Sequence, residues 1–174
     1  VITPYAVQRR IKACSTKFIV TDAKSVNNHL LHLCNDYHYE FGDVNGDKRQ
    51  DMIRFGEGGT DVAIATLSGF RAFKFWSADF SYSKGWRETR HLRRVGDVNG
   101  DGKADIVGFG EDGVYVAVST GRSFTFQGKW LNDLSYTSGA WRVTEHERRV
   151  ADVNGDNKAD LIAFGNFGVY VALS

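Results

Sequence analysis

A nine-residue stretch, residues 97–105, places side-chain oxygens at the spacing with which a short loop wraps a hard cation. Asp97, Asn99, Asp101 and Asp105 occupy its positions 1, 3, 5 and 9. Ca²⁺ takes about six to eight oxygen ligands and tolerates irregular geometry, so these side chains and the backbone carbonyl at position 7 form a suitable donor set. Gly102 at position 6 allows a sharp turn, because glycine adopts positive φ without steric cost.

The loop occurs three times at a nearly constant period. The other copies begin at Asp43, 54 residues before Asp97, and at Asp152, 55 residues after it. A single copy would also fit a metal-free turn, but three copies followed by the same apolar pattern favour calcium. The candidate ligands, with the carbonyl of position 7 included, are Asp43, Asn45, Asp47, Arg49, Asp51, Asp97, Asn99, Asp101, Lys103, Asp105, Asp152, Asn154, Asp156, Lys158 and Asp160.

The first loop departs from this pattern at position 6. Lys48 stands there, where the other two loops have Gly102 and Asn157. A lysine tolerates positive φ poorly and adds a positive charge to the loop. We therefore expect the first calcium site to be the weakest of the three.

Short strands are the elements that position these loops. Each loop is followed by an apolar run, a glycine turn and a second apolar run, which predicts a hairpin. In the second repeat the two runs are residues 106–110 and 115–119. A third strand ends at Trp76 or Trp130, and a segment that starts at His91 or His146 is the strand leading into the next loop.

Each unit thus has four strands and no predicted helix in about 54 residues. This period indicates an all-β fold of β-propeller blades, each with four antiparallel strands. The repeats cover about 17–71, 72–126 and 127–174, and residues 1–16 form an N-terminal segment or linker. Three blades are too few for a closed, well-packed ring, and unpaired edges must be covered. We expect a second copy of the chain (a dimer) or further sequence to complete the ring.

Residues 96–110 resemble the FG-GAP/VCBS repeat, the blade unit of integrin α-chain propellers, many secreted bacterial proteins and mushroom propeller lectins. The resemblance extends strongly over residues 40–174 and weakly over 17–39. The spacer that contains Trp86, His91 and Arg94 is most similar to the lectin branch. The resemblance implies Ca²⁺ in the three loops, largely structural in the lectins, and sugars bound in pockets between adjacent blades.

Aromatic and histidine side chains are the candidates for contacting a sugar. An aromatic ring stacks on the apolar face of a sugar ring while nearby polar groups bind its hydroxyls. The alternative is that the tryptophans pack in the core, as large apolar rings usually do. The candidate ligand-binding residues are Trp76, Trp86, His91, Trp130, Trp141 and His146.

The composition limits the classes of partner. The 174-residue chain is 42% hydrophobic and has a net charge of +1, so no overall field favours nucleic acid or an anionic membrane. It has no run of 18 apolar residues that would span a bilayer. It also lacks an initiator methionine and a signal peptide, so we expect a mature or excised chain.

Two cysteines, Cys14 and Cys34, fall in the N-terminal segment. A disulfide between them would close a loop of about 20 residues and contribute roughly 3 kcal/mol. Two free thiols are the alternative. Low-affinity calcium loops suit the millimolar calcium outside cells, so we expect a secreted, extracellular protein with this disulfide.

The three loops and the resemblance to the lectin branch together predict a calcium-stabilised carbohydrate-binding protein, a lectin with shallow sugar sites between blades. One alternative is an integrin-like protein–protein adhesion module, and another is the non-catalytic propeller portion of a larger secreted enzyme. We do not expect catalysis, because no Ser/His/Asp or Cys/His arrangement has a recognisable context.

Overall fold

The computed structural model describes residues 37–174, and its regular elements there are strands apart from one short 3₁₀ helix, η1 (Tyr82–Lys84). The predicted all-β class is confirmed for this part of the chain. The N-terminal segment 1–16, the start of the first repeat and the Cys14–Cys34 pair lie outside the described residues. No helix within residues 37–174 is long and apolar enough to cross a membrane.

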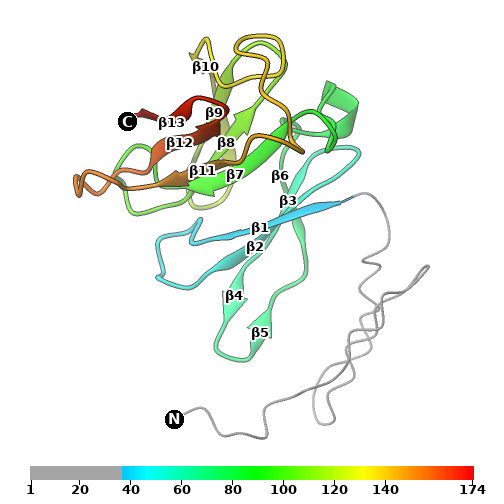
Figure 1. Ribbon diagram of the computed structural model, residues 1–174. Helices are drawn as coiled ribbons and strands as arrows, with labels where there is room; N and C mark the ends of the chain where they lie inside the picture. The colour runs from blue at the N-terminus through cyan, green and yellow to red at the C-terminus, as the bar shows by residue number, and fades with distance from the viewer. Residues whose placement is uncertain (1–36) are drawn as a thin grey trace, which may run out of the picture. The chain divides into compact units, whose positions relative to one another are not determined.

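The strands form consecutive antiparallel sheets (Figure 1). The first sheet has the order β1 (His38–Gly42), β2 (Asp51–Phe55), β3 (Thr60–Ala63) and β6 (Lys74–Ser77). The second sheet contains β7 (Leu92–Gly96), β8 (Asp105–Phe109), β9 (Val114–Ser119) and β10 (Phe124–Leu131). The third has β11 (Arg148–Ala151), β12 (Asp160–Gly165) and β13 (Gly168–Ala172).

Four-stranded sheets made from neighbouring strands are the blade pattern that the sequence predicts. The sheet boundaries nevertheless differ from the repeats 17–71, 72–126 and 127–174, because β6 pairs with β3 and β10 pairs with β9 of the preceding hairpin. The strand expected to end at Trp76 begins at Lys74 and ends at Ser77. The residues before it form the small hairpin of β4 (Ala65–Thr66) and β5 (Gly69–Phe70).

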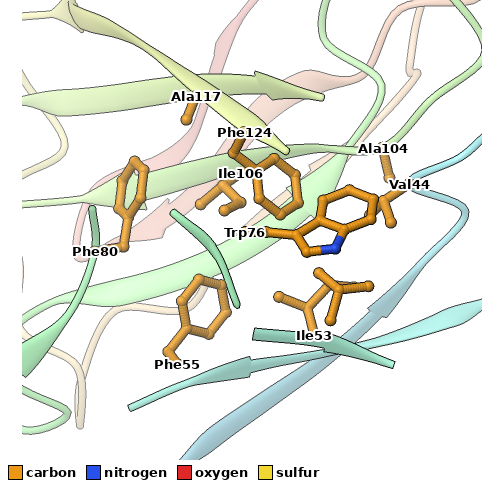
Figure 2. Packing of buried hydrophobic residues seen from close by; sticks show 10 residues of the cluster. Val44, Ile53, Phe55, Trp76, Phe80, Ala104, Ile106, Ala117 and Phe124 are labelled. Carbon is orange, nitrogen blue, oxygen red and sulfur yellow. The ribbon is translucent and has the colours of Figure 1, made fainter. Parts of the chain in front are cut away.

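The apolar core lies between neighbouring sheets. One cluster joins the first two sheets and includes Phe55, Trp76 and Phe124, which Figure 2 shows around a common centre. A second cluster joins the second and third sheets around Phe109 and Trp141. Each sheet therefore depends on the next one to bury its face.

Backbone hydrogen bonds also join neighbouring sheets at the loops. The N–H of Ala104 donates to the carbonyl of Asp43 (2.7 Å), and the N–H of Ala159 donates to the carbonyl of Asp97 (2.6 Å). This approach requires small residues, because a Cβ added to Gly96 would lie only 3.0 Å from the Cβ of Ala159. The loops thus sit where one sheet meets the next.

The third sheet leaves its far face exposed. Phe164 is 41% exposed, whereas the equivalent Phe109 and Phe55 are fully covered by the following sheet. Val169 and Val171 on the same sheet are likewise exposed. Residues 37–174 therefore form blade-like sheets in series, and they do not themselves make a closed ring.

Candidate functional site

The three predicted metal loops have one shared architecture. They connect β1 to β2, β7 to β8 and β11 to β12, and in each the first aspartate caps the turn. In the second loop the N–H of Gly100 donates to Asp97 Oδ1 and that of Gly102 donates to Asp97 Oδ2, both at 2.7 Å. Asp43 and Asp152 accept the equivalent bonds. The loop fold is therefore encoded by the first aspartate in every copy.

The aspartate at position 9 holds the loop to the sheet. Asp105 is fully buried, and its Oδ1 accepts from the N–H of Ser119 (2.7 Å) while its Oδ2 accepts from that of Val98 (3.2 Å). Burial raises the pKa of Asp105 to about 7, although these two hydrogen bonds favour the ionised form. Asp51 and Asp160 are equally buried and make the same pair of bonds.

The expected left-handed backbone is present at position 6 of all three loops. The φ angle is 66° at Lys48, 81° at Gly102 and 68° at Asn157. A lysine in this region carries steric strain that glycine avoids, so the first loop is the least favourable of the three. That its calcium site is the weakest stays a prediction.

The donor chemistry of the loops fits Ca²⁺, because every candidate ligand offers oxygen. In this structure the loop oxygens accept backbone N–H groups instead, and Asp101 Oδ2 lies 2.8 Å from Lys103 Nζ. No group of three or more His, Cys, Asp or Glu side chains within residues 37–174 is arranged to hold a metal ion. The calcium ligands therefore stay a prediction from the sequence.

A cavity of about 250 Å³ opens where the first sheet passes to the second. The segment between β6 and β7 supplies one wall, and the β8–β9 turn with β9 and β10 supplies the other. Its aromatic walls meet at Tyr115, whose ring lies 6.2 Å from that of Trp86 and 6.1 Å from that of Phe126. Its lining side chains include Trp86, His91, Glu111, Asp112, Tyr115 and Phe126.

Two carboxylates of this cavity are held in place by neighbouring groups. Glu111 accepts from Arg90 Nη2 (2.5 Å) and from His91 Nε2 (3.0 Å). Asp112 accepts from Lys129 Nζ (2.6 Å) and from the hydroxyl of Tyr115 (2.5 Å). A carboxylate has about four lone-pair positions, so each retains capacity to accept a further hydroxyl. The cavity thus combines apolar ring faces with fixed acceptors.

The tautomer of His91 follows from its two hydrogen bonds. Its Nδ1 accepts the N–H of Arg87 (3.1 Å), so the proton is on Nε2, which donates to Glu111. The side chain is only 8% exposed. Burial lowers the pKa of His91, and the hydrogen bond to Glu111 opposes that effect without reversing it. His91 is therefore a neutral positioning group for Glu111 at neutral pH.

We expect His91 to make the protein less stable in mild acid. Its pKa is lower in the folded than in the unfolded chain, so the unfolded chain takes up the proton first and the free energy of unfolding falls as the pH drops through about 6.5. Denaturant titrations between pH 5 and pH 8, compared with His91→Gln, would measure this. An NMR titration that placed the pKa of His91 above 6.5 would contradict the assignment.

The next junction repeats part of this site. Trp141 lies edge-on to Tyr170 (5.5 Å) and to His146 (5.2 Å), and the N–H of Arg142 donates to His146 Nδ1. The positions of Glu111 and Asp112 are taken by Asn166 and Phe167. The second junction therefore keeps the aromatic scaffold but lacks both carboxylates.

The other two tryptophans that were predicted to contact a sugar lie outside both of these sites. Trp76 is 8% exposed, and its ring centroid lies 5.3 Å from that of Phe124. Figure 2 shows both side chains in the core. Trp130 is 48% exposed on β10 and does not line the cavity of Trp86. The structure thus brings Trp86 and His91 together, repeats this pair at Trp141 and His146, and separates Trp76 and Trp130 from both.

Four residues of the cavity were missed by the sequence reasoning: Glu111, Asp112, Tyr115 and Phe126. They belong to the second sheet, which follows Trp86 in the chain, and lie on a turn and on two strands that approach Trp86 only in the folded protein. One signal was available, because Tyr115 recurs as Tyr170 at the same point of the next repeat. Of the two carboxylates on the turn, Glu111 recurs only as Glu57 in the first repeat and Asp112 has no counterpart, so periodicity did not identify this pair.

Comparison with known proteins supports this architecture. Residues 97–163 match the FG-GAP-like repeat family. No curated protein matches the chain. A solved lectin from Agrocybe aegerita, described as recognising non-reducing terminal N-acetylglucosamine, is 35% identical, with a TM-score of 0.72. The match covers 79% of this chain and 35% of that one, so the chain spans about a third of the lectin's length. The chain thus carries an FG-GAP-like repeat and is similar in structure to a mushroom lectin.

Proposed function

We propose that this protein binds carbohydrate in the cavity of Trp86 and Tyr115. The observation that carries the proposal is the pairing of aromatic ring faces with two fixed carboxylates at the junction of two sheets. Sugars present an apolar ring face and several hydroxyls, which such a site complements. A volume of about 250 Å³ suits one sugar residue, and similarity to the Agrocybe aegerita lectin makes terminal N-acetylglucosamine the first ligand to test.

We expect Trp86→Ala to weaken N-acetylglucosamine binding at least about tenfold, because the stacking surface is lost. Trp130→Ala is the matched control, since it removes an exposed tryptophan outside the cavity. Isothermal titration with both variants would measure the difference. Because Trp86 also packs on Phe80, Asp112→Asn on the exposed rim is a second test that leaves the core intact. Equal affinities for all four proteins would exclude the cavity as the sugar site.

We also propose that calcium stabilises the sheets and that the protein acts outside cells. Ca²⁺ would be held by the oxygens of the three loops, and the first aspartate of each loop would be the shared ligand. When bound, the cation would neutralise carboxylates that stand close together at each sheet junction. The role is structural, because the cavity of Trp86 uses none of the predicted calcium ligands. We propose no catalytic role for the chain.

The ring is proposed to be completed by a second copy of the chain or by further sequence. The support is the exposed apolar face of the third sheet, whose equivalents in the first two sheets are buried by a following sheet. The same face would also suit a protein-binding adhesion module. Light scattering of the purified chain separates these cases: a dimer supports ring closure by self-association, and a monomer favours the alternatives.

A further inference from the structure

A second, larger cavity lies on the calcium-loop side of the junction between the first two sheets. Its volume is about 820 Å³, and it is bordered by the first metal loop, the segment 64–74 and the β9–β10 turn. None of the residues that line it belongs to the cavity of Trp86. It is therefore a separate site, and the proposed carbohydrate function does not account for it.

The charge of this cavity is strongly biased. Its lining includes four cationic side chains, namely Arg49, Arg71, Lys74 and Arg122, and a single carboxylate, Asp47. Arg49 already pairs with that carboxylate, since its Nη2 lies 2.5 Å from Asp47 Oδ2. No carboxylate of residues 37–174 forms an ion pair with any of the other three cations. Three unpaired positive charges thus share one concave surface.

The three unpaired cations are particular to this junction, whereas Arg49 recurs as Lys103 and Lys158. One repeat later, the positions of Arg71 and Lys74 are occupied by Thr125 and Gly128, and one repeat earlier Arg122 corresponds to Ser68. The blade framework therefore does not need positive charge at these places. Most other cations on the described surface do have partners, such as Lys129 with Asp112 and Arg90 with Glu111. Arg71, Lys74 and Arg122 are all exposed, so solvent screens their mutual repulsion, and an anionic ligand would relieve the repulsion that remains.

We propose that this cavity binds the anionic group, a carboxylate or a sulfate, of an acidic sugar. Guanidinium groups form paired hydrogen bonds with planar oxyanions, and an ammonium group adds a point charge. The lining also offers Thr66 and Ser68 for hydroxyls and an apolar edge at Ile64 and Leu67. The cavity is larger than an inorganic anion requires. The preference for an anion follows from the cavity alone, whereas the sugar that carries it rests on the proposed function.

The test compares ligands that differ only in charge. Glucose 6-sulfate, glucuronic acid, glucose and sodium sulfate are titrated into the full chain at low salt, with NMR detection of residues 66–74 and 121–122. We expect both acidic sugars to bind at least about tenfold more tightly than glucose, and added NaCl to weaken them. Binding of glucose 6-sulfate no tighter than that of glucose would overturn the proposal. If sodium sulfate bound as tightly as glucose 6-sulfate, the cavity would still be an anion site, but the proposal that its ligand is a sugar would be wrong.

Variants assign the binding to this cavity. The double variant Arg71→Thr with Lys74→Gln should weaken glucose 6-sulfate binding about tenfold or more. Arg149→Thr, which removes an exposed cation elsewhere, should leave it unchanged. Equal effects of the two would overturn the site. If the double variant did not fold, Arg122→Ser, which installs the residue of the preceding repeat, is used. N-acetylglucosamine binding at Trp86, followed in the same samples, separates failure here from failure of the proposed function.

Discussion

Replacing Asp105 with alanine is expected to lower the free energy of unfolding of the metal-free protein by about 2–6 kcal/mol. The carboxylate is fully buried and accepts the N–H groups of Val98 and Ser119. Those two groups are themselves buried, and each would cost about 1–3 kcal/mol when left without an acceptor. Equilibrium denaturation in the presence of a chelator measures the change.

Asp101→Ala is the matched control for this prediction. It removes the same side chain from the same loop, but Asp101 is exposed and its partners are the neighbouring Lys103 and Asn99. Its loss in the metal-free protein should cost less than about 1 kcal/mol. Equal losses for the two variants would mean that the buried hydrogen bonds of Asp105 do not hold the loop to the sheet. The two aspartates are indistinguishable in the sequence motif, and only burial separates their roles.

The parts of the fold that the sequence predicts are those encoded locally. The loop spacing from Asp97 to Asp105, the glycine turns and the apolar runs give the β8–β9 hairpin and its repetition in the other two sheets. The sheet to which β6 belongs was harder to predict from the sequence. Its pairing with β3 continues beyond the β4–β5 pair, and the two together correspond to the continuous β9–β10 hairpin of the second sheet, where Ser119 pairs with Phe124 as Ala65 does with Phe70. The sequence does not show that this hairpin is interrupted in the first sheet.

The candidate site could be predicted from the sequence only in part. Trp86 and His91 lie on one segment and could be proposed together from their spacing. Trp76 matched Trp130 in sequence, yet the second sheet buries Trp76, whereas the third sheet leaves Trp130 exposed. Equivalent positions differ because burial depends on what the next sheet contributes. Sequence periodicity identifies the framework, whereas the pattern of contacts between repeats decides which aromatic residues can meet a ligand.

Removing calcium is expected to produce the largest change in stability. A ligand that binds only the folded chain adds about 2.7 kcal/mol when its free concentration is 100 times its dissociation constant, so three sites would add about 8 kcal/mol. A domain of this size shifts its melting temperature by about 2–4 °C per kcal/mol, which predicts a fall of more than about 15 °C on chelation. Calorimetry in millimolar Ca²⁺ and in excess chelator measures this difference.

The loop geometry explains why chelation should destabilise the protein without preventing it from folding. The first and last aspartates of each loop already bind backbone N–H groups, so the turn persists without metal. Calcium then acts by mass action on a preformed loop, and each site contributes separately. Asp101→Ala should therefore remove about a third of the calcium-dependent shift, and Lys48→Gly, by removing a positive charge from the first loop, should enlarge it. Identical melting in both buffers, with no calcium found by elemental analysis, would refute calcium binding.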